Sequence, residues 1–378
     1  MTHIFIVNEQ TLKVHLEHMF AGTGYGENEP DFLAIEKDSD FADSTEQVYV
    51  SMIADISKVR IGDKVAFYVT GCKKIFGFFK IKSNPFFESF ESNYLGGFLG
   101  KYLPLRVLLE PDEVYAEGIT ELEALDDISC IEHPYQMCWS LIYRKLTGMR
   151  GCSFVTESEY NILKTKIAEK NANCTINYNS FSYDNDNQCI ISYDCPSEYT
   201  GEQDISLYIG NRILNVRNSF EGHLQAYIIQ NCENEPLKKL LFPENFINVW
   251  IGNEVICSVG EQRIDILFII EQDDKYIIRI IELKDEKPTA DIVNKQMVWY
   301  IKWVQQYIVP NLYKSVEIIP TIIAGTYKRS CPGKTNFYDA CDNYNANKPQ
   351  NTNNVSLNKL EFVKFIRTNN DISFEKVI

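Results

Sequence analysis

Residues 263–284, RIDILFIIEQDDKYIIRIIELK, constrain the fold of this chain more than any other segment. Two runs rich in isoleucine flank the polar residues 272–275, a pattern that predicts a β-hairpin. A turn centred on these four residues places Asp265 directly opposite Glu282. Opposed side chains on paired strands have β-carbons about 4.5–5.5 Å apart. The two carboxylates could therefore share one cation.

The alternation of side chains along a strand extends this interpretation to a third residue. Lys284 lies two residues after Glu282 and therefore on the same face of the predicted sheet. The opposite face is apolar and carries Ile264, Ile266, Ile281 and Leu283. Facing carboxylates within apolar strands repel each other unless a cation lies between them. The alternative is a surface hairpin whose solvated face happens to carry these three charges, but few other residues on that face are polar.

Helical patterns flank the hairpin on both sides. SFEGHLQAYIIQN (219–231) predicts a helix with Glu221 in its first turn, and residues 289–310 predict a longer helix. Gln296 shares one stripe of that second helix with Tyr300. Each residue also has a simpler interpretation. Glu221 would be an acidic residue that favours the helix dipole, and Gln296 a solvated polar residue.

Taken in order along the chain, these polar residues resemble the motif of the PD-(D/E)XK nuclease superfamily. The residues are Glu221, Asp265, Glu282, Lys284 and Gln296. The segments EGHLQAYIIQN, GEQRIDILFI, IIELKDE and KQMVWYIKWV look more specifically like the catalytic domain of NucS-type endonucleases, over residues 215–325. One departure is Ile264, which stands where proline is common among relatives. The resemblance implies an αβββαβ core that hydrolyses DNA phosphodiesters with Mg²⁺, for which Mn²⁺ could substitute.

The resemblance also implies a role for each residue. Asp265 and Glu282 would bind the metal, and Glu221 would reach it directly or through water. Hard carboxylate oxygens suit Mg²⁺, which lowers the pKa of a bound water and neutralises charge on the phosphate. Lys284 would orient the attacking water or hold the phosphate, and Gln296 would complete the site. We also expect Arg263, opposite Lys284 in the pairing, to lower the pKa of that lysine by like-charge repulsion.

The N-terminal part resembles a different family. HIFIVNE at residues 3–9 and RIGDKVAFYVTGCKKIFGFFKIKSNPFFE at residues 60–88 are similar to EVE domains of the PUA-like fold, over about residues 1–170. That resemblance implies a β-barrel whose relatives hold a flipped, modified base in an aromatic pocket, where a base needs stacking surfaces and polar groups.

The candidates for such a pocket combine aromatic side chains with small polar ones. They are Asn8, Tyr25, Tyr68, Thr70 and Trp139. Arg144, Lys145 and Arg150 form a candidate strip for phosphate contacts. For the first group the alternative is an ordinary place in the core or in a loop. For the second it is a solvated helix face.

Length and composition set the wider limits. A chain of 378 residues predicts two domains, here residues 1–170 and 206–378. The Asn- and Ser-rich residues 171–205 predict a linker that contains at most one hairpin. A net charge of −15 argues against a protein that coats nucleic acid non-specifically, although a local basic groove is compatible with it.

The remaining composition indicates where the protein works. The eleven cysteines include no CxxC pair, which favours a reducing cytoplasm over a disulfide framework. The first residues do not form a signal peptide, and no apolar run reaches the roughly 20 residues of a membrane span. We therefore expect a soluble cytoplasmic protein without a membrane partner.

Three functions remain open from the sequence. The first is a modification-dependent restriction endonuclease that cleaves double-stranded DNA near a modified base, a cytosine derivative above all. The second is a repair-type or conventional restriction nuclease that recognises DNA structure or unmodified sequence. The third is a non-catalytic nucleic-acid-binding protein on a nuclease fold, against which the intact Asp265, Glu282 and Lys284 count. Cutting both strands with one site per chain would favour a homodimer.

Overall fold

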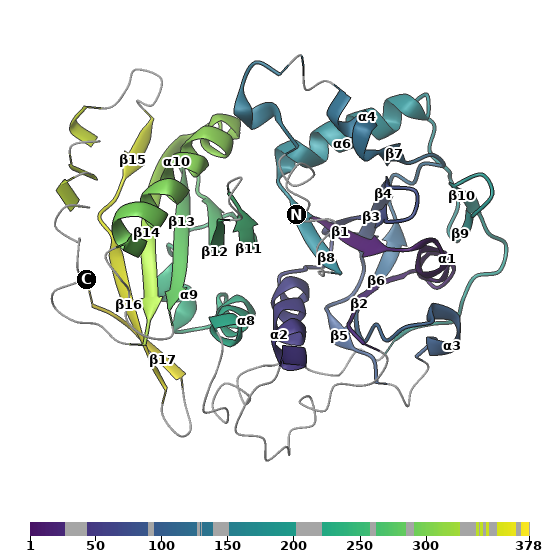
Figure 1. Ribbon diagram of the computed structural model, residues 1–378, viewed down its shortest axis with the longest axis horizontal. Coiled ribbons are helices and arrows are strands. Elements are labelled where there is room, and N and C mark those ends of the chain that lie inside the picture. The colour runs from purple at the N-terminus through teal and green to yellow at the C-terminus, as the bar shows by residue number, and fades with distance from the viewer. Residues whose placement is uncertain are drawn as a thin grey trace. The chain divides into compact units, whose positions relative to one another are not determined.

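The protein is described here from a computed structural model, which divides into two compact units. The described residues of the first unit end at Gly201, and those of the second begin at Glu221. The structure describes residues 1–26, 44–89, 94–126, 129, 131–138, 151–201, 221–257, 262–284, 291–325, 338–339, 341–342, 345–347, 354–367 and 372–377. Each unit is a mixture of helices and strands (Figure 1).

Unit 1 consists of ten strands and several helices in its described part. The strands are β1 (Thr2–Val7), β2 (Phe20–Thr23), β3 (Lys64–Val69), β4 (Lys74–Ile81), β5 (Phe86–Phe87), β6 (Leu105–Pro111), β7 (Ile119–Thr120), β8 (Cys152–Val155), β9 (Phe181–Asp184) and β10 (Cys189–Ser192). The helices are α1 (Glu9–Glu17), α2 (Ser44–Ser57), α3 (Gly96–Leu99), α4 (Glu121–Leu125), the 3₁₀ turn η3 (Pro134–Gln136) and α6 (Glu157–Lys170).

The main sheet of unit 1 is mixed and curls into a half-barrel. Its strand order is β2-β6-β4-β3-β1-β8, with β5 paired to β6 and β7 to β4. Strand β1 pairs in parallel with β3 and antiparallel with β8, so the first strand of the chain lies inside the sheet. Its apolar residues are buried with those of β3 and β4 in one core cluster, to which α6 adds Leu163 and Ile167.

Local sequence signals account for two of the helices in unit 1. Asn8 begins α1 with a capping box, because its side chain accepts from the Thr11 amide at 2.8 Å. Thr156 begins α6 in the same way, together with Glu159. A capping side chain satisfies amide groups that a helix start would otherwise leave without partners.

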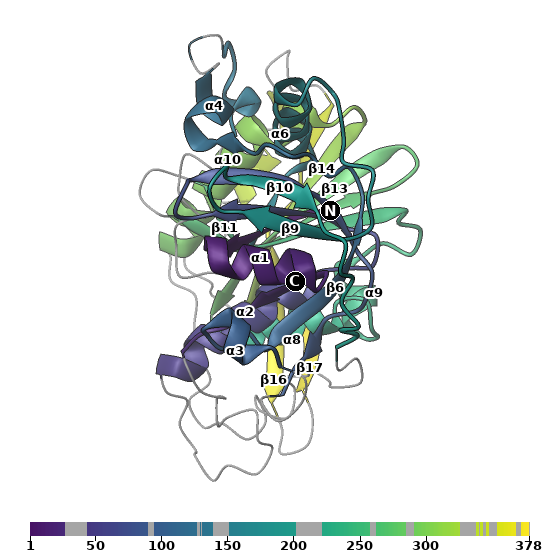
Figure 2. The ribbon, with the colours of Figure 1, turned by 90° about the vertical axis from the view of Figure 1, so that its right-hand side faces the viewer.

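The linker predicted over residues 171–205 is described as far as residue 201, and these residues are packed onto unit 1 instead. Their one expected hairpin is present as β9 and β10, and β9 lies against α1 (Figure 2). Phe181 and Tyr183 are buried, and Tyr183 contacts the ring of Phe76. The polar composition conceals these few large aromatic anchors, so the boundary lies later than residue 170.

Unit 2 has a second mixed sheet with few helices. Its strands are β11 (Asn248–Ile256), β12 (Arg263–Glu271), β13 (Lys275–Lys284), β14 (Ser315–Ala324), β15 (Val355–Leu357), β16 (Glu361–Arg367) and β17 (Ile372–Lys376). Its helices are α8 (Glu221–Asn231), α9 (Leu237–Leu241), the π-helical turn η5 (Ile292–Gln296), α10 (Met297–Tyr307) and the 3₁₀ turn η6 (Val309–Asn311). The strand order is β11-β12-β13-β14-β16-β17, with β15 paired to β14.

The centre of this sheet carries the predicted hairpin in the predicted register. Strands β12 and β13 pair antiparallel from Ile266 with Ile281 to Glu271 with Tyr276. The next residues outward are Asp265 and Glu282, as the sequence predicts. Strand β13 then pairs in parallel with β14 along its whole length, so it is a central strand, and both α8 and α10 contact it (Figure 1).

The chain thus has the coarse fold that was expected, a mixed α and β protein with one large sheet in each unit. No helix in the described parts of the chain is long and apolar enough to cross a membrane. The cysteines in those parts are all free thiols.

Candidate active site in the C-terminal unit

Asp265 and Glu282 come from neighbouring strands and lie close together. The Asp265 carboxylate accepts a hydrogen bond from the amide of Leu283, the residue after Glu282, at 2.6 Å. This bond draws the Asp265 side chain across from β12 towards β13. The register of the hairpin therefore fixes the spacing of the two acids.

Glu282 is the most enclosed of the charged groups at this site, with an exposed fraction of 1 %. Its Oε1 accepts from Gln296 Nε2 at 2.9 Å and pairs with Lys284 Nζ at 3.0 Å. Its Oε2 is buried and has no hydrogen-bond partner among the described residues. A buried carboxylate oxygen without a partner is energetically unfavourable, so a cation, a water or a proton at this atom would stabilise the site.

Lys284 connects Glu282 to the helix that precedes the sheet. Its Nζ also lies 3.1 Å from Glu221 Oε2 and 3.2 Å from Glu221 Oε1. All five residues predicted from the sequence for this site are therefore brought together: Glu221, Asp265, Glu282, Lys284 and Gln296. Gln296 ends the π-helical turn η5, a type of distortion that is frequent at functional sites.

The electrostatics of the site follow from burial and from the crowding of like charges. Burial raises the pKa of the Asp265 carboxyl well above its ordinary value, and the charge of Glu282 raises it further. Burial also raises the pKa of Glu282, although Lys284 acts in the opposite direction. Two carboxyl groups this close cannot both ionise easily without a cation.

The expectation that the pKa of Lys284 is lowered is wrong. Burial acts to lower the pKa of Lys284, but the charges of Glu282 and Asp265 outweigh it, and the net shift is upward. The guanidinium of Arg263 pairs with Glu254 instead, at 3.4 Å. The one cation opposite Lys284 can be read from the hairpin register, whereas the several anions around it become its neighbours only in the folded chain.

Three further residues, which the motif alone did not identify, belong to the site. Gln225, one helical turn after Glu221 on α8, donates from Nε2 to the Asp265 carbonyl at 2.8 Å and to Glu254 Oε1 at 3.2 Å. Tyr300, one turn after Gln296, is fully buried, accepts from Gln296 Nε2 at 2.5 Å and donates to the Arg263 carbonyl. A spacing of four residues from a site residue on a helix was the signal that could have found both Gln225 and Tyr300.

No comparable sequence pattern indicates the third residue, Glu254. The β11–β12 ladder pairs Asn253 with Ile266 and Val255 with Ile264, which leaves Glu254 opposite Asp265. The connection between these strands, residues 257–262, is longer than a two-residue turn and does not fix which residues face each other, so their register could not be predicted.

The donor set fits a hard divalent cation that is held by few protein groups. Within the described ranges no three His, Cys, Asp or Glu residues are grouped as a metal site. Mg²⁺ is commonly held by one or two carboxylates together with waters and substrate phosphate. Asp265 and Glu282 supply two such carboxylates, and the buried Oε2 of Glu282 lacks a partner. The residues present therefore fit the group that the resemblance implies.

The described pocket candidates of unit 1 make hydrogen bonds within that unit. Asn8 caps α1. Tyr68 is 1 % exposed and donates to Glu121 at 2.7 Å, and the Thr70 hydroxyl donates to the Val7 carbonyl at 3.2 Å. Tyr25 is exposed to 40 %, with its backbone bonded to Tyr49 of α2.

Four remaining candidates lie outside the described residues. They are Trp139 in the pocket set and Arg144, Lys145 and Arg150 in the phosphate set. The described residues shortly before Trp139 form the 3₁₀ turn η3.

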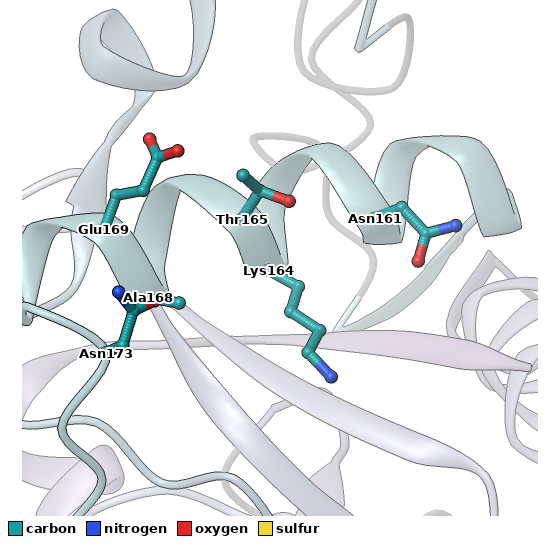
Figure 3. A pocket seen from close by; sticks show the side chains of 6 residues that line it. All are labelled: Asn161, Lys164, Thr165, Ala168, Glu169 and Asn173. Carbon is teal, nitrogen blue, oxygen red and sulfur yellow. The ribbon is translucent and has the colours of Figure 1, made fainter.

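A shallow depression of about 560 Å³ lies on the outer side of α6 (Figure 3). It is lined by Asn161, Lys164, Thr165, Ala168, Glu169 and Asn173. The lining contains no aromatic side chain and none of the pocket candidates, and Lys164 is paired with Glu113 at 2.5 Å. The depression therefore lacks the stacking surface that a flipped base needs.

Comparison of the sequence with models of known protein families and with curated proteins finds no match. Any assignment of function therefore depends on the site itself.

Proposed function

We propose that this chain is a metal-dependent DNA endonuclease with its active site in unit 2. The observation that carries the proposal is the buried carboxylate of Glu282, whose Oε2 has no partner among the described residues although Asp265, Lys284 and Gln296 surround it. A structural role would not require two opposed acids inside a central strand pair. A cation that binds substrate phosphate would make use of both.

In this proposal Asp265 and Glu282 hold Mg²⁺, with Mn²⁺ as an alternative. When bound, the ion supplies a more acidic water and neutralises the charge that grows on the phosphate. Gln296 fixes Glu282 through its 2.9 Å bond, and Tyr300 fixes Gln296. Hydrogen-bonded partners of this kind orient metal-binding carboxylates and hold them in place.

The positively charged side chain of Lys284 interacts with the substrate in this proposal. Its ammonium group is held between Glu221 and Glu282, within reach of a phosphate oxygen or of the water that attacks phosphorus. In the reaction a water oxygen bonds to phosphorus, the bond from phosphorus to the leaving oxygen breaks, and that oxygen takes up a proton. Positive charge placed beforehand beside the phosphate stabilises the extra negative charge of the transition state.

We further propose that unit 1 selects the DNA, with a modified cytosine as its target. This part of the proposal derives from the resemblance to EVE domains. Among the described candidates it depends on Tyr25, an aromatic residue that is 40 % exposed and could stack on a base, together with the exposed Asn8 and Thr70.

A second candidate function is a nuclease that recognises unmodified sequence or DNA structure. The observation in its favour is that Asn8 and Tyr68 are already engaged in a helix cap and in the core of unit 1. A protein that reads duplex shape would need no pocket for an extruded base.

One experiment tests both proposals. Plasmids that differ only in cytosine, methylcytosine or hydroxymethylcytosine are incubated with the full chain and Mg²⁺. Cleavage of a modified plasmid alone supports modification dependence, and equal cleavage of all three supports the second candidate. No cleavage of any of the three with Mg²⁺ or Mn²⁺ contradicts the nuclease assignment.

A further inference from the structure

Arg263 is an exposed cation on the same strand as one of the two proposed metal-binding acids. It lies two residues before Asp265 on β12, so strand alternation directs both side chains to the same face of the sheet. Its side chain is 44 % exposed, and its Nη1 lies 3.4 Å from Glu254 Oε2. Its backbone carbonyl accepts from Tyr300, which ties the start of β12 to α10.

Glu254 is held in place by more than this one ion pair. It lies opposite Asp265 and adopts a left-handed backbone conformation, with φ of 49°. Such a conformation is unfavourable for a residue other than glycine and is found mostly where the surroundings enforce it. Here Gln225, which is 3 % exposed, donates at once to Glu254 Oε1 and to the Asp265 carbonyl. The position of Glu254 is therefore coupled to that of Asp265.

The other cation of the site is already engaged. Lys284 is shared between Glu221 and Glu282, both within 3.2 Å. A polyanionic substrate that approaches this acidic site needs a positive group that is still accessible. A guanidinium has five N–H donors that suit phosphate oxygens, and the contact with Glu254 is the one ion pair that the described residues give Arg263.

We propose that Arg263 binds a backbone phosphate of the polynucleotide beside the bond that is cut, and that Glu254 is a positioning residue that orients its guanidinium. The inference rests on the proposed nuclease function and adds a substrate contact outside the motif. Gln225 extends the same arrangement to the Asp265 main chain, so the phosphate contact and the metal-binding acid keep a fixed geometry.

The first test measures phosphate contacts by their dependence on salt. The full chain and its Arg263→Gln variant are titrated with a labelled duplex over a range of salt concentrations, with Ca²⁺ in place of Mg²⁺. Each phosphate contact contributes about 0.9 to the slope of log affinity against log salt. We expect the slope to fall by about one and the affinity to fall by about tenfold for every sequence tested.

The matched control for this test is Lys239→Gln, which removes one exposed charge from α9, away from the site residues. Its slope should equal that of the unchanged protein. Melting curves of both variants establish that they fold. An Arg263→Gln variant that is folded and keeps the original slope and affinity overturns the proposed contact.

The second test asks whether Glu254 acts through Arg263. Glu254→Gln should raise KM for DNA and leave kcat nearly unchanged, and the double variant Glu254→Gln/Arg263→Gln should be no worse than Arg263→Gln alone. Residues that act as one unit are not additive in such a cycle. Additive losses would overturn the positioning role of Glu254.

These outcomes are separable from the proposed function. If the unchanged protein cuts no DNA, the nuclease proposal fails, and the salt slope still decides the phosphate contact. If the unchanged protein cuts DNA and Arg263→Gln binds with the original slope, only the present inference fails.

Discussion

Glu282 is the residue on which the site depends most, because it is buried with a charged lysine on one side and a like-charged Asp265 on the other. Such an arrangement is costly in a protein that has no use for it.

Asp265→Asn removes one of the two facing charges and keeps the side-chain shape. Cleavage should fall by about a thousandfold, because several kcal/mol of transition-state stabilisation are lost with the cation. The free energy of unfolding of the metal-free protein should be no lower than before, since the repulsion from Glu282 is relieved. Plasmid cleavage and denaturant unfolding measure the two effects. Near-normal cleavage would contradict the assignment.

Gln296→Ala tests the hydrogen bond to Glu282. Loss of a group that orients a metal-binding carboxylate typically lowers metal affinity or activity by about 10- to 100-fold. We expect the Mg²⁺ concentration for half-maximal cleavage to rise accordingly. Asn294→Ala, an exposed position in the same π-helical turn, is the control and should behave as the unchanged protein. Equal behaviour of the two variants would remove Gln296 from the site.

At the scale of single elements, variants of Asn8 at the start of α1 distinguish a helix cap from a residue that contacts a DNA base. Asn8→Ala should lower the free energy of unfolding by about 1 kcal/mol, because the helix loses its cap, and Asn8→Asp should restore it. Neither variant should change the affinity for modified DNA. Thermal unfolding and DNA titration check the two expectations. A change in affinity without a change in stability would return Asn8 to the base pocket.

An ion pair whose contribution to stability depends on pH joins β13 to β16 across β14. Arg279 is bonded to Glu361 and also donates to the Leu241 carbonyl at 3.0 Å. Burial acts to raise the pKa of Glu361, but the charges of Arg279 and Lys376 outweigh it and the net shift is downward. A carboxyl with a lowered pKa in the folded state stabilises the protein above its usual pKa of 4.5, and this stabilisation is lost as the pH falls below that value.

Glu361→Gln should therefore destabilise the protein by about 3 kcal/mol at neutral pH, because it leaves Arg279 buried without its anion. The difference from the unchanged protein should shrink as the pH falls below about 4.5. Asp342→Asn breaks an exposed pair with Lys359 and should change stability by less than about 1 kcal/mol. Denaturant unfolding across this pH range measures both. A difference that stays constant with pH would exclude the ion pair as its cause.

At the scale of the whole molecule, the end of unit 1 is set by aromatic contacts rather than by composition. Tyr199 is 9 % exposed, accepts from Arg106 at 2.8 Å and donates to Glu88 at 2.5 Å. Its ring lies 5.3 Å from that of Phe20. Removal of residues 171–201 would thus open the core of unit 1 at several points.

A fragment of residues 1–201 should fold as a cooperative unit, and a fragment of residues 1–170 should not. Each buried aromatic side chain that is lost accounts for about 3–5 kcal/mol, and a domain has about 5–15 kcal/mol in total. Circular dichroism and thermal unfolding of both fragments decide this. A shorter fragment that melts as cooperatively as the longer one would place the boundary back at residue 170.

The sequence determined those features that depend on contacts close along the chain. The hairpin of β12 and β13 and its register follow from a short turn between two alternating strands, and α6 begins after Thr156 because its capping box lies in its own first turn. The choice of Asp265, Glu282 and Lys284 follows from this register, and that of Glu221 and Gln296 follows from the resemblance of the sequence to a nuclease motif. Tertiary structure decided what depends on pairings between distant segments. Three findings are of this kind: the burial of aromatic residues within 171–201, the upward pKa shift of Lys284 and the position of Glu254 opposite Asp265. Each depends on residues that are distant in the sequence and that no local pattern predicts. The physical reason is that local hydrogen bonds and side-chain periodicity act over a few residues, whereas burial and charge depend on everything within a few ångströms in space.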